Sequence, residues 1–394
     1  MAAPFIAGYF VSYVFRMVNA VLAPVLAREF DLTAGGLGLL SGVYFLSFAL
    51  FQLPAGLLLD RFGPRRVNAA LLLVAAAGGL WFAGAESAGS AAAARALIGL
   101  GVAVCLMSTF QAFVLWYPAG QISTMNAIAF SAGALGGITV TVPLEMLLRV
   151  LHWREAFLII VGFTLAVSAL LWFWAPERST GTRGEPLPDQ LRGLGRLMRD
   201  AAFLRAAICL GLSQFTAVSL QTLWVATWLR DVVGWNPAKV ALGLLAVNGS
   251  MIVGYLVFGR AADAAARRGR SARPVLLGGL LLSSLSLGLL ALGVTRASLL
   301  LWCLFVLGGT AITLVYSMLS RRTPKEMSGR VNTALNVFAF AGVFVGQWVF
   351  GLVLDLWPQT ATGYAPDAYG VALGLCWVIQ AAGIAWLWSG RRLL

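Results

Sequence analysis

The sequence is a succession of long apolar stretches separated by short polar segments. Twelve of these stretches hold about 20 predominantly apolar residues, the length that an α-helix needs to cross a bilayer. Strands that cross a membrane would instead show segments of about 10 residues in which apolar and polar side chains alternate. The pattern therefore predicts an all-α membrane protein with spans near residues 5–28, 37–59, 67–85, 91–116, 125–148, 155–175, 203–229, 237–259, 274–293, 298–319, 330–354 and 369–389.

The longest hydrophilic segment divides the chain into two halves of six spans each. It reads PERSTGTRGEPLPDQLRGLGRLMRD, and its proline, glycine and charged residues are typical of a linker. We expect an N-terminal six-helix bundle, a cytoplasmic linker and a C-terminal six-helix bundle, with boundaries at residues 1–176, 177–201 and 202–394.

Two motifs occur once in each half, at nearly the same separation along the chain. Gly56 and Asp60 precede an arginine cluster in GLLLDRFGPRR, and Gly259 and Asp263 precede another in GRAADAAARRGR. A second pair, PAGQISTMNA and PKEMSGRVNT, stands before spans five and eleven. Repeated motifs at one offset indicate two pseudo-symmetric bundles. Internal repeats of this kind are typical of transporters in which two bundles rock around a site at the bilayer midplane.

Composition and charge narrow the class of protein further. The chain is 60% hydrophobic and 11% charged, whereas soluble domains have about 25% charged residues. The net charge of +13 does not indicate a nucleic-acid partner, because the arginines are scattered over loops. Most of the 28 Lys and Arg residues fall on the loops that share a side with the N-terminus, so the positive-inside rule places both termini in the cytoplasm. The use of arginine in place of lysine and the abundance of Ala, Gly and Leu indicate a bacterium with a GC-rich genome, so we expect the membrane to be a bacterial inner membrane.

Two stretches resemble motifs of a known family. GLLLDRFGPRR resembles the loop between spans two and three of the major facilitator superfamily, and RALIGLGVA resembles its span-four motif. The resemblance covers the whole chain in span count, central linker and repeat. It implies the major facilitator fold, with conformational gating by Gly56, Asp60, Arg65, Arg66, Gly259, Asp263 and Arg95.

The resemblance also implies how the gating motifs act. Gly56 would let another helix approach closely. Asp60 would face the N-terminus of span eleven, around Ser328–Asn332, when the cytoplasmic side is shut. A helix N-terminus carries about half a positive charge, which favours a carboxylate there. Asp263 would make the equivalent contact with the start of span five.

A single arginine, Arg16, lies near the middle of the first span. An arginine at a helix centre costs about 2.5–3.5 kcal/mol on insertion scales, so such a residue usually faces a cavity or a partner. Tyr9, Tyr13 and Arg16 share one helical face, and Asn19 lies a turn further along. No acidic residue stands at matching depth in any span, and a guanidinium can bind a carboxylate or phosphate through two hydrogen bonds. We expect this face to bind an anionic substrate; the alternative is a structural contact that orders the bundle.

The stretch GYFVSYVFR is similar to the first span of the organophosphate:phosphate antiporters and of the anion:cation symporters. The resemblance implies that its arginine and two tyrosines contact the substrate. Where the antiporters keep a second arginine in span seven, this chain has Gln214, Gln221 and Trp228 at intervals of seven residues. One cationic group favours a monoanion, or a larger and partly polar solute, over a phosphate ester. The carboxylate that the symporters tend to carry in span four is also missing here.

Other polar or aromatic side chains complete the set of candidate substrate contacts. Each is equally well placed to bond a neighbouring helix, and the set comprises Asn19, Gln111, Gln214, Gln221, Trp228, Tyr316 and Asn336. A proton-coupled carrier also needs a group that binds and releases a proton. Glu145 and Asp231, near the outer ends of their helices, are candidates, although a solvated or paired role at the membrane surface suits them better. The same holds for His152.

We predict a secondary transporter that moves a small organic anion by alternating access, as a monomer in the bilayer and without a cofactor. Two alternatives stay open: a proton-coupled exporter of amphipathic compounds or siderophore-like chelates, with Glu145 as its proton site, and a transporter-like solute sensor. An enzyme is not expected, because the sequence shows no nucleophile–base constellation, no metal cluster and no phosphate-binding loop.

Overall fold

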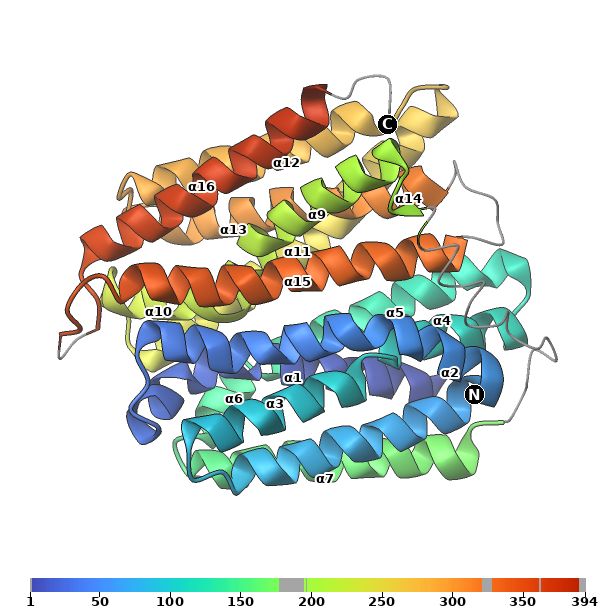
Figure 1. Cartoon of the computed structure of the whole chain (residues 1–394), viewed down its shortest axis with the longest axis horizontal. Helices are drawn as coiled ribbons and strands as arrows, with labels where there is room; N and C mark the ends of the chain where they lie inside the picture. Colours follow the sequence, from blue (N-terminus) through green and yellow to red (C-terminus); the bar gives the residue numbers. More distant parts are fainter. Residues whose placement is uncertain (1, 177–194, 196, 321–327, 361–362, 390–394) are drawn as a thin grey trace. The chain divides into compact units, whose positions relative to one another are not determined.

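The protein is almost entirely helical (Figure 1). The computed structural model describes residues 2–176, 195, 197–320, 328–360 and 363–389, so most of the predicted linker lies outside the described residues. Within this part of the chain, twelve helical stretches are long and apolar enough to cross a membrane. The prediction of an all-α protein with twelve spans is confirmed.

The helices fall into two compact units, residues 1–32 with 39–187 and residues 33–38 with 188–394. In the first unit α1 packs against α3, α4, α5 and α7, and in the second α9 packs against α15 and α16. In chain order the elements are α1 (Ala3–Glu29), α2 (Ala34–Ala83), α3 (Ala88–Val102), α4 (Cys105–Trp116), α5 (Ala119–Thr139), α6 (Val142–Leu147), α7 (Trp153–Trp174), α9 (Ala201–Ser219), η1 (Leu220–Trp224), α10 (Val225–Asp231), α11 (Pro237–Arg267), α12 (Arg273–Ala291), α13 (Ser298–Gly309), η2 (Thr310–Thr313), α14 (Leu314–Ser320), α15 (Ser328–Leu354) and α16 (Pro366–Ser389). The first turn of α2 therefore belongs to the second unit and the rest of α2 to the first.

α2 contains both the second and the third span. The sequence predicts a loop between them, but the helix continues through Asp60 and turns only at Gly63, where φ is 78° and ψ is 161°. A positive φ of this size favours glycine, which lacks a Cβ. Pro64 follows directly, and proline is well suited to restart a helix because the first N–H groups have no intrahelical partner. A sharp kink thus replaces the expected loop.

Four predicted spans are interrupted along their length. Span four breaks between α3 and α4, span five breaks between α5 and α6, span seven contains the π-helix η1, and span ten contains the 3₁₀-helix η2. Backbone groups released by such breaks need other partners inside a membrane. The carbonyl of Ala103, at the break in span four, accepts a hydrogen bond of 3.2 Å from Gln52 Nε2. Non-α turns inside long helices often accompany functional sites, and the break in span seven includes the candidate Gln221.

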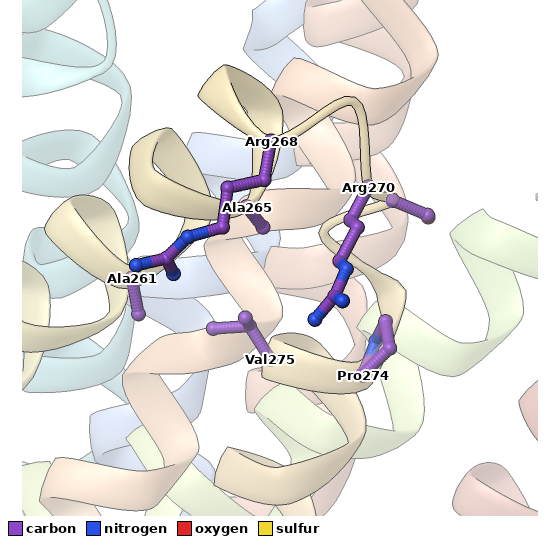
Figure 2. A pocket seen from close by; sticks show the side chains of 7 residues that line it. Ala261, Ala265, Arg268, Arg270, Pro274 and Val275 are labelled. Atoms are coloured by element: carbon purple, nitrogen blue, oxygen red, sulfur yellow. The ribbon is translucent and has the colours of Figure 1, made fainter.

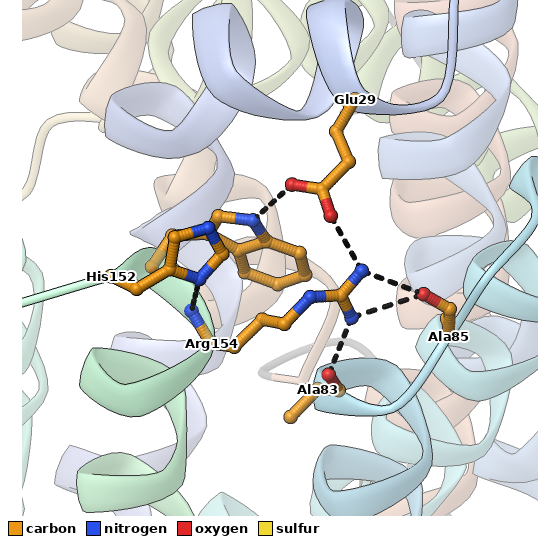
Figure 3. A network of polar contacts seen from close by, with 6 residues as sticks. Glu29, Ala83, Ala85, His152 and Arg154 are labelled. Carbon is orange, nitrogen blue, oxygen red and sulfur yellow. Dashed lines mark hydrogen bonds and ion pairs between the residues drawn. The ribbon is translucent and has the colours of Figure 1, made fainter.

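One polar cluster ties together the ends of α1, α2 and α7 (Figure 3). Glu29 accepts hydrogen bonds from Trp153 Nε1 and Arg154 Nη2, each 2.5 Å long. Arg154 Nη1 also donates to the carbonyl of Ala83 at 2.5 Å. His152, the only histidine of the chain, caps the N-terminus of α7 and contributes to its capping box. The cluster therefore stabilises the helix ends of the first unit.

Candidate functional site

Arg16 and the two tyrosines lie on one face of α1, as their spacing predicts. The rings of Tyr9 and Tyr13 meet edge-on with centroids 5.2 Å apart, and Arg16 Cζ lies 4.6 Å from the centroid of Tyr13. Both tyrosines are buried, whereas Arg16 keeps part of its surface exposed. Arg16 is therefore the most exposed residue of the three.

Two aromatic residues of α2 complete the surroundings of Arg16. The ring centroid of Phe48 lies 5.5 Å from Arg16 Cζ. The hydroxyl of Tyr44 donates to Ser12 O at 3.2 Å and also interacts with the Arg16 guanidinium. Aromatic faces attract a cation, so these rings hold the guanidinium in place. The sequence analysis missed both residues, and their i, i+4 spacing in span two was the only available signal.

Arg95, which we expected to act in gating, lies beside α1 and α2. It is fully buried (0% exposed), and its Nη1 donates to Phe15 O at 3.0 Å. Its Cζ lies 4.9 Å from the ring centroid of Tyr44 and 5.9 Å from that of Phe82. Within the described part of the chain, no carboxylate pairs with it. Tyr44 thus touches Arg95 with its ring and Arg16 with its hydroxyl, and the two guanidiniums make this region positive.

The glycine-rich stretch GALGG on α5 forms the surface against which the tyrosines of α1 pack. A Cβ atom at Gly133 would lie 2.6 Å from Tyr9 Cε1 and 3.0 Å from Tyr13 Cδ2. Small residues permit this close approach between helices in membranes. Gly133 therefore sets the position of both phenols.

We expect Gly133→Ala to displace Tyr9 and Tyr13 and to lower thermal stability. A Cβ atom 2.6 Å from a ring carbon forces a shift, and overpacking typically costs about 1–3 kcal/mol. Gly162→Ala on α7 is the matched control, because a Cβ there meets no described atom within 4 Å. Thermal unfolding of the purified variants measures the difference. Equal midpoints for the two variants would contradict the packing role of Gly133.

Two further candidates of the first unit are amides with unused acceptors. Asn19 is buried, and its Nδ2 donates to Ser41 Oγ of α2 at 2.9 Å. Asn19 Oδ1 and Gln111 Oε1 are buried oxygens that accept no hydrogen bond within the structure as described. Buried polar atoms normally have a partner. These two oxygens are therefore suited to accept hydrogen bonds from the hydroxyl groups of a ligand.

In the second unit, four polar residues form two hydrogen-bonded pairs. Gln221, in the π-helix η1, donates from Nε2 to Asn248 Oδ1 of α11 at 2.9 Å. The hydroxyl of Tyr316 on α14 donates to Asn336 Oδ1 of α15 at 2.7 Å. The sequence analysis named three of these residues but missed Asn248 as the partner of Gln221. All four side chains are uncharged.

The remaining candidates of the second unit differ in their exposure. Trp228 is buried against Trp302, with ring centroids 5.6 Å apart, whereas Gln214 on α9 is half-buried. Gln347 of α15, which the sequence analysis did not select, donates to Thr222 Oγ1 of η1 at 2.8 Å. Trp228 therefore contributes to packing, and Gln214 is the more accessible of the two candidates.

The first gating motif lies at the kink of α2. Asp60 and Arg66 are exposed, and Arg65 Nε donates to Trp172 O near the C-terminal end of α7 at 3.1 Å. A Cβ at Gly56 would meet no described atom within 4 Å. The start of span eleven, the expected partner of Asp60, lies partly outside the described residues. That contact therefore stays a prediction.

The second gating motif lies within a helix. α11 continues to Arg267, so Gly259 and Asp263 are on its last turns and not in a loop. Asp263 is exposed, and a Cβ at Gly259 would likewise meet nothing within 4 Å among the residues described. The extension follows from the alanine-rich sequence AADAAAR, because alanine has the highest helix propensity.

Both candidate proton sites are engaged by protein groups. Arg149 contacts Glu145 through hydrogen bonds of 3.0 and 2.9 Å, and these bonds raise the pKa of the Arg149 guanidinium. Asp231, whose side chain is 1% exposed, accepts hydrogen bonds from Arg230 Nε at 2.6 Å and from the Tyr369 hydroxyl at 2.7 Å. Neither carboxylate is presented alone to a cavity or to solvent.

Another carboxylate, Asp355, caps the first turn of α2 within the second unit. It accepts hydrogen bonds from the backbone N–H groups of Ala34 at 2.9 Å and Gly35 at 2.8 Å. It also accepts a hydrogen bond of 2.7 Å from the hydroxyl of Tyr364. Burial, together with this hydrogen bond, raises the pKa of Tyr364 to about 12. The cap satisfies N–H groups that have no partner inside the helix and places negative charge at the positive end of α2.

The fold has twelve spans in two repeated units, and an arginine-centred polar cluster lies inside the first unit. These features are typical of membrane carriers. The family model of the Major Facilitator Superfamily matches residues 5–347. The chain belongs to this superfamily.

Individual relatives are transporters of organic anions. A D-galactonate transporter of Escherichia coli is 25% identical over an alignment of 406 positions, gaps included, which covers 94% of this chain and 90% of that protein. A probable sulfoacetate transporter of Cupriavidus necator is 24% identical over 228 residues, which cover 58% of this chain and 52% of that protein. The match thus spans about half the length of the sulfoacetate transporter.

A solved structure shows the same fold. The bacterial homologue of the human lysosomal transporter Spinster, in an inward-facing and unoccupied conformation, matches with a TM-score of 0.81 at 14% identity. The alignment covers 100% of this chain and 96% of that one. The family and its relatives confirm that the protein is a multi-pass membrane transporter and not an enzyme.

Proposed function

We propose that the protein is a secondary active transporter that carries a small organic anion across a bacterial inner membrane by alternating access. Both termini are cytoplasmic in this proposal, and the bundles 1–176 and 202–394, joined by the linker 177–201, rock about the substrate. The observation that supports it best is the partly exposed Arg16 guanidinium, held by aromatic residues beside the fully buried Arg95.

The anionic group of the substrate is a carboxylate or a sulfonate. Either group can accept two parallel hydrogen bonds from a guanidinium, and the D-galactonate and sulfoacetate relatives carry substrates with such groups. The buried acceptors Asn19 Oδ1 and Gln111 Oε1 suit hydroxyl groups, and the candidate residues of the second unit are uncharged. We therefore expect a hydroxylated monocarboxylate such as D-galactonate to be a better substrate than a dianion such as sulfoacetate.

Counterflow in proteoliposomes tests this function. Vesicles loaded with unlabelled D-galactonate should transiently accumulate the labelled compound from outside, because a carrier exchanges its substrate across the membrane. A solute sensor would bind the compound without accumulating it. Parallel assays with sulfoacetate, an amphipathic cation and a ferric chelate rank the substrate classes. Accumulation of the cation or the chelate, with none of either anion, would contradict the proposal.

Alternating access requires contacts that hold one end of the protein shut and then release it. The cap of Asp355 on α2 has this character, because α2 leaves the second unit after Gly38 and continues in the first. In the proposed topology α2 begins at the outer face of the membrane, where Asp355 caps it. Asp60 lies further along α2, at the cytoplasmic face. The carboxylates Asp60 and Asp355 would then act at opposite faces of the membrane.

We expect Asp355→Ala to release the backbone N–H groups of Ala34 and Gly35. Loss of a helix cap typically costs about 1 kcal/mol and up to about 2 kcal/mol, so these amides should exchange hydrogen roughly 5- to 30-fold faster. Hydrogen-exchange mass spectrometry of a peptide covering the start of α2 measures the rate. Asp367→Ala, an exposed carboxylate in the first turn of α16, is the control and should leave this peptide unchanged. Undiminished protection in the Asp355 variant would remove the cap from the mechanism.

A further inference from the structure

The turn between α11 and α12 concentrates positive charge next to two membrane-spanning helices. α11 ends at Arg267, Gly269 reverses the chain with a φ of 65°, and α12 begins at Arg273. Residues 260–273 include five arginines and a single carboxylate, that of Asp263. Like charges at this spacing repel one another, so an anion bound at the turn would stabilise it.

Two other arginines at helix ends of this unit are bonded to backbone carbonyl groups. Arg205 donates to Trp386 O at 2.7 Å, and Arg273 donates to Leu387 O at 2.8 Å, both in the last turn of α16. The last carbonyl groups of a helix lack intrahelical donors and carry partial negative charge. The positive charge of these two arginines therefore stabilises the C-terminal end of α16.

Arg268 and Arg270 differ from these arginines. Both side chains are exposed, and neither makes a hydrogen bond or an ion pair with any residue that the structure describes. Figure 2 shows that both extend from the turn along one cavity. This cavity has a volume of about 260 Å³, and its other lining residues include Ser271, Ala261, Ala265 and Val275.

The cavity combines two guanidinium groups with an apolar wall. A guanidinium binds phosphate oxygens through paired, charge-assisted hydrogen bonds. Ala261 and Ala265 stand on the last turns of α11 and Val275 on the first turn of α12, and both helices continue into membrane spans. A phosphate ion alone gains nothing from an apolar wall, whereas a phospholipid places glycerol and acyl atoms beside its phosphate.

We propose that this cavity binds the phosphate of an anionic phospholipid headgroup between Arg268 and Arg270. Clusters of basic residues directly beside a membrane span attract anionic lipids. The bound lipid anchors the α11–α12 turn at the membrane surface. The inference does not depend on the identity of the transported substrate.

Native mass spectrometry of the full-length protein tests this site. Protein in mixed phosphatidylglycerol and phosphatidylcholine should retain phosphatidylglycerol selectively. The Arg268→Ala/Arg270→Ala double variant should bind it at least about tenfold more weakly, the effect of about 1.4 kcal/mol. The matched control is Arg260→Ala/Arg267→Ala, which removes two exposed arginines of the same segment that do not line the cavity. The control loses only the diffuse attraction of two surface charges, so its binding should fall clearly less than that of the cavity variant.

Several results would overturn the proposal. Equal losses in the two double variants would indicate diffuse surface charge and no defined site. Equal retention of both lipids by the wild type would exclude headgroup recognition, and displacement of phosphatidylglycerol by millimolar inorganic phosphate would assign the cavity to free phosphate. The Arg268→Lys/Arg270→Lys variant guards against a folding defect, since it keeps the charge but loses the paired hydrogen bonds. Its binding should fall between wild type and the alanine variant, and unchanged binding would contradict the guanidinium geometry.

Discussion

Replacing Arg16 by alanine should lower uptake of the organic anion by about ten- to a hundredfold. A hydrogen bond to a charged group contributes about 1.5–3 kcal/mol, and about 1.4 kcal/mol corresponds to a factor of ten. Arg16 is a partly exposed residue of the first unit, and the rings of Tyr13 and Phe48 hold its guanidinium. Its replacement takes away the group that we propose binds the carboxylate, while the neighbouring aromatic residues stay packed.

Two further variants make this result specific. Arg16→Lys should retain a remnant of uptake, because lysine keeps the charge but cannot form two parallel hydrogen bonds from one planar group. Arg296→Ala removes an exposed arginine of the second unit and should transport like the wild type. Initial rates of labelled anion uptake into proteoliposomes measure all three variants. Wild-type rates in Arg16→Ala would show that the substrate binds elsewhere.

Replacing Arg95 by methionine should stabilise the empty protein and weaken anion binding at the same time. Arg95 is fully buried and bonded to one carbonyl group, and no carboxylate pairs with it in the described structure. A buried charge of this kind carries a desolvation cost that an apolar side chain of similar length avoids. The same charge attracts a substrate, since a unit charge roughly 10 Å away contributes about 1.7 kcal/mol at an effective dielectric constant of 20. The variant should therefore bind the anion about tenfold more weakly.

The opposite signs of these two effects distinguish an electrostatic role of Arg95 from a structural one. A thermal-shift titration reports both, as the unfolding midpoint without ligand and as its increase with D-galactonate. Arg95→Met should raise the first by a few degrees and reduce the second. Arg95→Lys should keep the increase, because lysine retains the charge. A lower midpoint in Arg95→Met with an unchanged ligand response would assign the residue to packing alone.

The spacing of residues within one helix could be predicted from the sequence. Tyr9, Tyr13 and Arg16 share a face because the α-helix repeats every 3.6 residues, and that geometry needs no knowledge of other helices. The count of twelve spans follows from apolar length in the same way. Contacts between helices could not be predicted from spacing or apolar length. Tyr44 and Phe48 reach Arg16 only because α2 packs beside α1, and nothing in the local sequence specifies that register.

Breaks in helices and long-range caps could not be predicted from the sequence for related reasons. The kink of α2 depends on one residue, Gly63, inside a stretch whose charges suggest a loop. The cap of Asp355 on Ala34 joins positions 321 residues apart, so no local pattern marks it. The gating role of Arg95, which the resemblance implies, stays a prediction, and its burial and its bond to Phe15 O could not be predicted from the local sequence. The fold therefore follows from hydropathy, whereas the composition of the site depends on tertiary packing.

A calorimetric titration with two matched ligands tests the account most directly. D-galactonate and galactitol share the hydroxyl groups of the other carbon atoms, but galactitol has a hydroxymethyl group where D-galactonate has its carboxylate. The wild type should bind D-galactonate at least about tenfold more tightly than galactitol, the effect of a lost charge-assisted contact of about 1.5 kcal/mol or more. Arg16→Ala should bind D-galactonate at least about tenfold more weakly than the wild type and keep only the smaller preference that the charge of Arg95 supplies. Equal binding of the two ligands by the wild type, or an undiminished preference for D-galactonate in Arg16→Ala, would contradict the role of the Arg16 guanidinium as the anion-binding group.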